Sequence, residues 1–270
     1  MKLLVYKAIK SVVMLADFCH SQQKGIIFLI YHRVNNTPQL DIDLPPSLFQ
    51  RQLDYLARTG RVIAYDHALE LLQRGTRFTD NLFVLTFDDG YEDFYTHVFP
   101  VLQERHLPAI LFVTTGFVEE GIPYPLSVSL APPARPVTWD MLGKLHASGL
   151  VTLGAHTHTH PNLVGKSVDR VEEELLRPLE LFHHRLGISV CHFAYPRALW
   201  DAHIEQLVQR FYASAVIAEG HKATTEHFNA YRIPRVPVRH SDGWLFALAK
   251  MQGWLEAEEK FFSRLRQFSS

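Results

Sequence analysis

The sequence predicts a single α/β domain built around a parallel sheet or a barrel. Short apolar runs alternate with stretches of helical periodicity along the chain, and no linker-like change in composition divides it. The apolar runs are continuous, as in parallel strands that are buried on both faces. With 270 residues, of which 47% are hydrophobic, the chain is long enough to bury a large core.

Eight segments have the composition of buried strands, since each is short, apolar and bounded by polar or turn residues. The clearest are GIIFLIYH, which Gly25 opens, and AILFVTT, which begins at Ala109. From the N-terminus, the predicted strands span residues 25–32, 61–64, 84–87, 109–115, 151–156, 191–196, 213–218 and 231–238.

Apolar residues at helical spacing predict the connecting helices. The helix over residues 47–59 has Ser47 as its N-cap candidate and ends before Gly60. Residues 119–137 are rich in proline and aperiodic, which predicts a long surface loop. The other predicted helices span residues 66–74, 95–105, 139–148, 169–186, 201–210 and 244–270.

Composition argues against a partner that is recruited by charge. The chain has 27 Lys and Arg against 28 Asp and Glu, and its formal net charge is −1. No overall field therefore attracts nucleic acid or an anionic membrane, and we expect no nucleic-acid partner. Cys19 and Cys191 are too few for a disulfide framework and too far apart in sequence for a CxxC metal pattern.

Residues 1–24 are expected to form an N-terminal helix. Its apolar positions are interrupted by Lys2, Lys7 and Lys10, and no small-residue cleavage site follows. Residues 1–18 therefore make a poor signal peptide, and they are too short and too charged to span a bilayer. We expect the helix to dock on its own domain in a cytoplasmic protein, with peripheral membrane contact through residues 1–18 as the alternative.

Two adjacent carboxylates, Asp88 and Asp89, follow the apolar run that ends at Phe87. Functional side chains of α/β folds gather at the carboxyl ends of parallel strands. Adjacent carboxylates raise one another's pKa unless a cation lies between them. The structural alternative is that they cap the helix that follows, because Asp is favoured at N-caps.

A histidine cluster follows the predicted strand at residues 151–156. In HTHTHP, His156, His158 and His160 alternate along the chain before Pro161. Residues i and i+4 share a face in a strand and in a helical turn, so either geometry brings His156 and His160 together. Two imidazoles and one carboxylate, from Asp89 or Asp88, are a common set of ligands for a divalent transition metal.

If one aspartate binds the metal, the other lies beside a metal-bound water and can act as its general base. A metal lowers the pKa of bound water from about 15.7 to about 7 and polarises a carbonyl oxygen. This combination suits the attack of water on an amide or an ester.

The segments TFDDGY and HTHTHP together resemble the first two motifs of the polysaccharide deacetylase family, carbohydrate esterases with the nodulation-type deacetylase domain. LIYHRVN, VTWDML and FAYPR follow the order found in the subgroup similar to poly-N-acetylglucosamine deacetylases. The resemblance spans residues 25–240. It implies a distorted (β/α) barrel, usually of seven strands, in a single domain over residues 25–243, with a C-terminal helix over residues 244–270.

Several residue roles follow from this resemblance. Asp89, His156 and His160 match the ligands of one divalent metal ion, for which zinc is preferred, and Asp88 matches the catalytic base. His158 lies between the ligands and is expected to support the loop. Thr157 and Tyr195 are expected to contact the substrate: Thr157 the acetate group and Tyr195 a sugar ring.

The third family motif departs from the usual pattern. Aligning FAYPRA on it places Ala194 where the family has an arginine that orients the base, and it places Arg197 where a backbone N–H stabilises the oxyanion. Arg232 and Arg235 are the available replacements, and we expect Arg235 to take the orienting role. The alternative is a structural arginine paired with a surface acid.

The family's late Leu-x-His motif, which supplies the general acid, has no clear counterpart after residue 220. His240 precedes a polar turn and is one candidate. His32, at the end of the first strand, is the preferred general acid. The alternative for His32 is that it satisfies a loop carbonyl.

The resemblance implies a metal-dependent hydrolase that removes an acetyl group, most often an N-acetyl group, from a glycan. The expected substrate is an N-acetylated oligo- or polysaccharide, or a lipid- or nucleotide-linked precursor. One alternative is a weakened family member that binds glycan without turnover, which the two departures motivate. Another is a small-molecule amidohydrolase on the same fold.

Overall fold

The computed structural model describes residue 10 and residues 23–35, 37, 40–121 and 134–254. Within these residues, seven parallel strands close into a barrel in sequence order, and β1 pairs with β7. The predicted seven-stranded (β/α) barrel is therefore confirmed. The strands are β1 (Ile26–Tyr31), β2 (Leu82–Phe87), β3 (Ala109–Val113), β4 (Val151–Ala155), β5 (His192–Ala194), β6 (Ser214–Ala218) and β7 (Ile233–Pro237).

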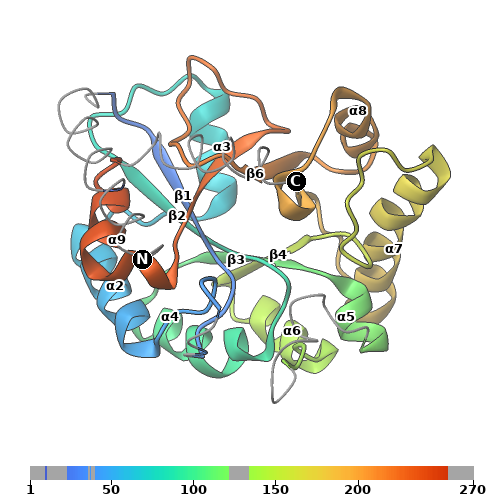
Figure 1. Ribbon diagram of the computed structural model, residues 1–270, viewed down its shortest axis with the longest axis horizontal. Helices are drawn as coiled ribbons and strands as arrows, with labels where there is room; N and C mark the ends of the chain where they lie inside the picture. Colours follow the sequence, from blue (N-terminus) through green and yellow to red (C-terminus); the bar gives the residue numbers. More distant parts are fainter. Residues whose placement is uncertain (1–9, 11–22, 36, 38–39, 122–133, 255–270) are drawn as a thin grey trace.

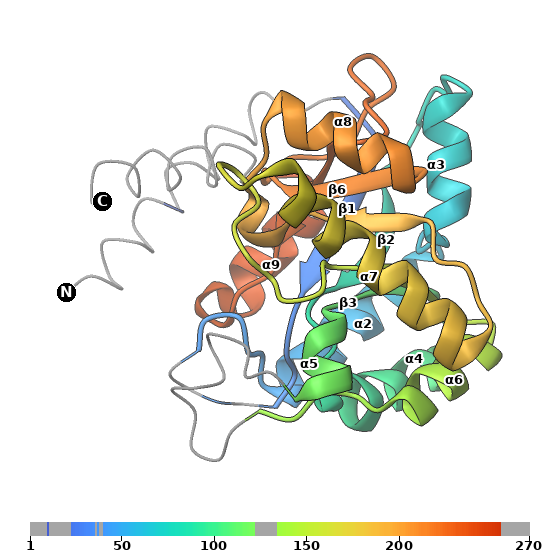
Figure 2. The same ribbon diagram turned by 90° about the vertical axis from the view of Figure 1, so that its right-hand side faces the viewer.

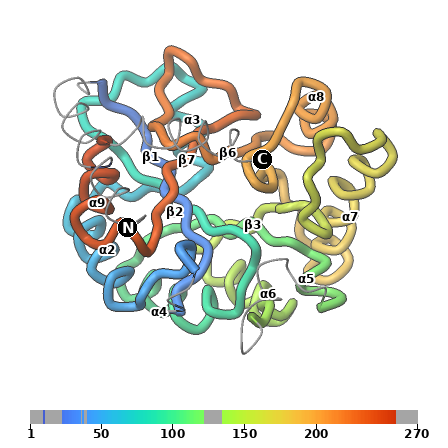
Figure 3. The backbone as a smooth tube through the Cα atoms, viewed as in Figure 1, coloured from blue at the N-terminus to red at the C-terminus, as the bar shows by residue number. Residues whose placement is uncertain are grey.

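Helices surround the strands (Figure 1). α2 packs beside α9 on one side of the barrel and α7 packs beside α8 on the other. The helices are α2 (Pro46–Thr59), α3 (Tyr65–Gln73), α4 (Phe99–Arg105), α5 (Thr115–Glu120), α6 (Trp139–Ala147), α7 (Val168–Leu186), α8 (Ala202–Phe211) and α9 (Gly243–Met251), with short turns η1 (Phe94–Val98), η2 (Pro196–Ala198) and η3 (His240–Asp242). Figure 2 shows α7 running along the outside of the barrel, and Figure 3 follows β7 alongside β1.

The strands bury both of their faces, in two separate cores. Successive side chains of a strand point to opposite faces, so one set fills the barrel and the other packs under the helices. Phe28, Phe112 and Ala194 belong to the inner core, whereas Leu29 and Phe193 belong to the outer core. This two-sided burial explains why the strands are continuous apolar runs in the sequence.

A polar cluster lies where β5 and β6 begin, at the end of the barrel opposite the carboxyl ends of the strands. Tyr65 of α3 packs edge-on against Phe28, and its hydroxyl lies 2.9 Å from Ser214 Oγ. His192 contacts the same Ser214 Oγ through Nδ1 at 2.9 Å and Asp66 Oδ1 through Nε2 at 2.8 Å. The buried imidazole is thereby satisfied on both nitrogens.

One predicted helix cap and one predicted strand were wrong. The first helix begins at Pro46, without a side-chain cap from Ser47, because proline at the first helical position already has a helical φ. Residues 61–64 form no strand and make one bridge, between Val62 and Phe83. β3 pairs with β2 only from Leu85 onward, and residues 61–63 contact the first half of the same β2 edge through two backbone hydrogen bonds with Phe83.

The helix predicted over residues 95–105 is divided into the π-turn η1 and α4. Pro100 has no N–H to donate to Thr96, which accounts for a widened turn before it: Phe99 N–H reaches back to Phe94 O. Most of the predicted N-terminal helix, residues 122–133 of the predicted loop and residues 255–270 of the predicted C-terminal helix lie outside the described residues. In the part that is described, no helix has the length and apolar character required to cross a bilayer.

The His192 cluster predicts that stability decreases at alkaline pH. Burial alone would lower the pKa of His192, but hydrogen bonds to Asp66 and Cys191 outweigh it and raise the pKa from 6.5 to about 9. A raised folded-state pKa stabilises the protein fully below the unfolded pKa, and this stability is lost as pH rises through about 9. We expect the free energy of unfolding to fall by on the order of 2 kcal/mol between pH 6 and pH 10. This figure already allows for solvent screening, because Asp66 is exposed.

Urea unfolding of wild type and Asp66→Asn at both pH values measures this loss. The variant lacks the carboxylate that favours the imidazolium, so its stability should change less than that of wild type between pH 6 and pH 10. Equal changes in the two proteins would show that His192 is not charged in the folded state.

Candidate active site

The parallel barrel brings three sequence-distant segments to one rim. His32 follows β1, Asp88 and Asp89 follow β2, and His156 follows β4. Because all strands run in the same direction, their carboxyl ends lie at the same end of the barrel. The residues predicted from separate motifs are therefore gathered there.

Asp89, His156 and His160 form a buried group of three donors. One ligand atom from each lies within 4.8 Å of the others, and no other such group of three occurs among the described residues. His156 Nε2 lies 3.2 Å from His160 Nε2 and 3.6 Å from Asp89 Oδ1, and His160 Nε2 lies 4.0 Å from the same oxygen. The sequence prediction that these residues converge is correct.

This donor set fits a tetrahedral divalent metal. With metal–nitrogen bonds of about 2.0–2.1 Å, two imidazole nitrogens bound to one zinc ion lie about 3.3 Å apart. His156 Nδ1 lies 2.7 Å from the Ala194 carbonyl oxygen, to which it donates, so Nε2 carries the lone pair. Burial lowers the pKa of His156 and of His160, which keeps both imidazoles in the neutral form that binds metals.

The backbone of the site is held in a conformation that most residues avoid. Asp89, Thr157 and His160 have φ of 77°, 63° and 55°. Each such residue costs on the order of 1–3 kcal/mol and persists only where its surroundings enforce it. Thr157 Oγ1 helps to enforce it, because it donates to His156 O at 2.6 Å and accepts from His160 N at 3.0 Å. The strain is concentrated at the residues that present the ligands.

Asp88 is paired with Arg235 inside the barrel. Two guanidinium nitrogens donate to its two carboxylate oxygens, at 2.6 and 2.8 Å. Arg235 also donates to Thr86 Oγ1 at 3.2 Å, and its side chain is 1% exposed. Burial would raise the pKa of Asp88, but the charge of Arg235 and its hydrogen bonds hold it well below its usual range. Asp88 is therefore an ionised carboxylate, 3.8 Å from His156 Nε2.

Of the two arginines considered from the sequence, the structure brings only Arg235 to Asp88. Arg232 instead forms an ion pair with Glu205 at 2.8 Å and stacks on Trp200. Ala194, the residue at the usual arginine position, lies in the inner core. The guanidinium therefore reaches Asp88 from β7 in place of β5.

His32 is half-buried, and the charge of the Asp88 carboxylate acts on it. Burial lowers its pKa to about 4, against the opposing pull of the Asp88 carboxylate. A neutral imidazole must first gain a proton to act as an acid, so the general-acid role of His32 stays a prediction. The other candidate, His240, contacts the backbone oxygen of Asp43 at 3.0 Å and so supports the loop after β1.

Two of the three residues predicted to contact the substrate or its oxyanion are buried. Thr157 is fully buried and ties the turn together. The ring of Tyr195 packs edge-on against Phe193 in the outer core and is 1% exposed, so it presents no open face to a sugar. Arg197 is exposed, with φ of 57°. The substrate roles of Thr157 and Tyr195 and the oxyanion role of the Arg197 N–H stay predictions.

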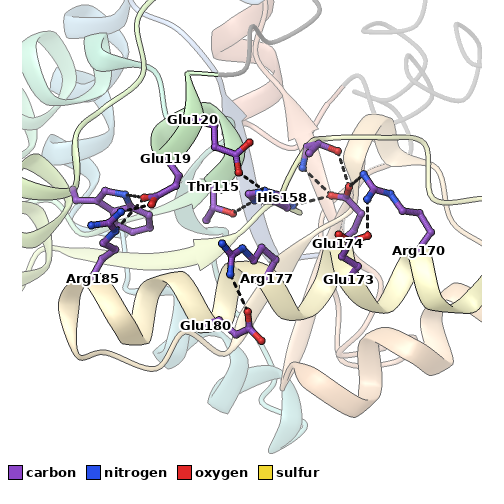
Figure 4. A network of polar contacts seen from close by, with 12 residues as sticks. Thr115, Glu119, Glu120, His158, Arg170, Glu173, Glu174, Arg177, Glu180 and Arg185 are labelled. Carbon is purple, nitrogen blue, oxygen red and sulfur yellow. Dashed lines mark hydrogen bonds and ion pairs between the residues drawn. The ribbon is translucent and has the colours of Figure 1, made fainter.

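Sequence reasoning missed two supports of the rim. Arg33 Nε donates to Asp93 Oδ2 at 2.8 Å, which ties the loop after β1 to the segment after β2. Glu174 of α7 accepts hydrogen bonds from the loop between the histidine ligands (Figure 4). A helical-face analysis would have found Glu174, because it falls on the buried stripe with Val171 and Leu175.

Comparisons with known proteins agree with this geometry. The sequence profile described as Polysaccharide deacetylase matches residues 76–216. A poly-beta-1,6-N-acetyl-D-glucosamine N-deacetylase of Staphylococcus aureus strain COL is 22% identical over 261 residues, covering 88% of this chain and 86% of that protein. The Escherichia coli K12 protein of the same name is 28% identical over 138 residues, covering 49% of this chain and 20% of its own length.

Two solved structures share the fold. IcaB from Ammonifex degensii is 26% identical with a TM-score of 0.70, covering 86% of this chain and 99% of that chain. Streptococcus pyogenes deacetylase PplD, solved in complex with acetate, is 21% identical with a TM-score of 0.72, covering 85% and 99%. The resemblance to poly-N-acetylglucosamine deacetylases is thus confirmed. Because the family profile covers just over half of the chain and includes both motifs of the site, the chain belongs to the polysaccharide deacetylase family.

Proposed function

We propose that this chain is a divalent-metal-dependent N-deacetylase that acts on an N-acetylglucosamine polysaccharide. The observation that carries the proposal is the buried donor group of Asp89, His156 and His160 beside a separate ionised carboxylate, Asp88. The substrate class is supported by the relatives named above as poly-beta-1,6-N-acetyl-D-glucosamine N-deacetylases.

Asp89, His156 and His160 would hold the metal, for which zinc is the preferred identity. Bound there, a divalent ion would activate water and polarise the acetamide carbonyl. Asp88 accepts a proton from the attacking water, and Arg235 fixes the orientation of its carboxylate through two hydrogen bonds. Water adds to the carbonyl carbon and the C–N bond breaks. The proton taken up by Asp88 passes to the leaving amine nitrogen, and the acetic acid that remains ionises to acetate.

The weakened, glycan-binding alternative rested partly on the missing third-motif arginine. Arg235 supplies a guanidinium to the base from β7, which removes that argument. Strong pairing keeps Asp88 ionised at neutral pH, although it also makes the carboxylate a weaker base. Binding alone gives no reason to keep an ionised carboxylate beside the metal donors. A small-molecule amide stays an outcome of the test below, and the cellular compartment stays a prediction.

The proposed roles of Asp88 and His156 separate in a single experiment. Wild type should bind about one zinc ion and release acetate from oligomers of β-1,6-linked N-acetylglucosamine. Asp88→Asn should retain zinc and lose on the order of 10² to 10⁴ in rate, because only the base is removed. His156→Ala should lose zinc and activity together. Zinc content by mass spectrometry and acetate by a coupled assay are the two measurements.

His67→Ala is the matched control for His156→Ala, because its side chain is 56% exposed on α3. It should leave zinc content and rate unchanged. Wild type that binds zinc without releasing acetate from any acetylated sugar would contradict the proposed substrate class. Wild type without zinc would contradict the proposed metal site.

Replacing Arg235 should destabilise the fold through its partner. In Arg235→Met, Asp88 is left as a buried charge without its guanidinium, which we expect to cost about 3–5 kcal/mol in urea unfolding. The double variant Asp88→Asn/Arg235→Met should regain part of that loss, because no buried charge remains.

Arg232→Met is the control for Arg235→Met. Its arginine is 40% exposed, so we expect a loss of about 1 kcal/mol or less. If both single variants unfold at the same urea concentration, Asp88 does not depend on Arg235 for its charge.

A further inference from the structure

One buried carboxylate outside the donor group contacts the loop between the two histidine ligands. Glu174 of α7 is 1% exposed. Its Oε2 accepts from His158 N at 3.0 Å and Thr159 N at 2.8 Å, and its Oε1 accepts from Thr159 Oγ1 at 2.6 Å. Figure 4 shows the glutamate reaching this loop from the helix. The Glu174 carboxylate is neither a metal donor nor the base in the proposed function.

The loop has only five residues from ligand to ligand. His156 opens it and His160 closes it, and both Thr157 and His160 have positive φ. On the side away from Glu174, Gly116 N at the start of α5 donates to His158 O at 2.7 Å. Glu120 of α5 also contacts the His158 side chain, at 3.2 Å from Nε2, but it is half-exposed. The loop is therefore held between two helices, and α7 provides the buried carboxylate that binds its backbone.

We propose that Glu174 is a positioning residue that fixes residues 157–159 in the conformation that presents His156 and His160 to the metal. This inference rests on the metal site of the proposed function. By fixing this loop, Glu174 sets the affinity for the metal without binding the metal itself.

The physical reason is preorganisation. Two consecutive N–H groups converge on one carboxylate oxygen, an arrangement in which the left-handed residue before them turns both amides to the same side. Without an acceptor, these amides favour other loop conformations, and the ordering of the ligands must then occur when the metal binds. Groups that orient ligands typically change metal affinity or activity by about 10- to 100-fold.

Glu173, the residue before Glu174 in α7, offers a matched comparison because both glutamates pair with Arg170. The Arg170 guanidinium pairs with Glu174 at 2.8 Å and with Glu173 at 2.6 Å. Both glutamates carry one charge and one ion pair with Arg170, but Glu173 is 60% exposed and lies on the solvent side of the helix. Of the two, Glu174 is the one that joins the pair to the loop.

The test compares Glu174→Gln with Glu173→Gln. A glutamine amide offers one acceptor oxygen in place of two and brings N–H groups toward the loop donors. Zinc dissociation constants are measured by competition with a chelator, and hydrogen exchange of the His158 and Thr159 amides is measured without metal. We expect Glu174→Gln to raise the dissociation constant about 10-fold or more and to speed exchange of both amides. Glu173→Gln should change neither by more than about twofold.

The outcomes separate this inference from the proposed function. If wild type binds no zinc, the proposed function fails, and the exchange rates alone decide whether Glu174 fixes the loop. If wild type binds zinc and folded Glu174→Gln binds it equally well, only the positioning role is overturned.

Two further variants keep the test decisive if Glu174→Gln does not fold. Thr159→Val removes one of the three loop contacts and keeps the carboxylate, so its zinc dissociation constant should rise above that of wild type by a factor of less than about 10. Glu174→Asp keeps the charge on a side chain one methylene shorter, so its carboxylate reaches the loop amides less well and its zinc dissociation constant should lie above that of wild type. Wild-type affinity in Thr159→Val, together with unchanged exchange of the Thr159 amide, would contradict the proposal.

Discussion

The pairing of β1 with β7 is the constraint on which the site depends. It closes the barrel in a register that sets Arg235 opposite Phe28, whose side chain is in the inner core. Arg235 therefore points inward and reaches past β1 to Asp88 at the end of β2. Shifting that register by one residue would turn the guanidinium to the outside of the barrel. The base is thus oriented by the closure of the fold itself.

β5 has Ala194 where the family has an arginine, so the proposed base Asp88 is supported from β7. The metal donors Asp89, His156 and His160 still come together. Ala194 lies in the inner core, and its backbone oxygen accepts from His156 Nδ1. β5 thus retains a part in orienting a ligand, whereas β7 orients the base. Around them, Glu174 and the start of α5 hold the strained ligand loop from two sides. The site is a set of short loops whose conformations the surrounding helices enforce.

Much of this could be predicted from the sequence because the barrel strands are apolar on both faces and the ligands lie in two short motifs. Residue order alone could favour Arg235 over Arg232 without deciding between them, because the choice depends on the β1–β7 register. The packing of Tyr195 in the outer core could not be predicted, since it depends on which face a residue just after a three-residue strand takes. The π-turn before Pro100 was also missed, because helical periodicity does not show one widened turn.

The most direct test of this account is an anomalous scattering map at the zinc edge from crystals grown with zinc. The account predicts one strong peak about 2.0–2.2 Å from His156 Nε2, His160 Nε2 and an Asp89 oxygen, with Asp88 still paired with Arg235. A peak bound by Asp88 in place of Asp89, or no peak between the two histidines, would contradict it.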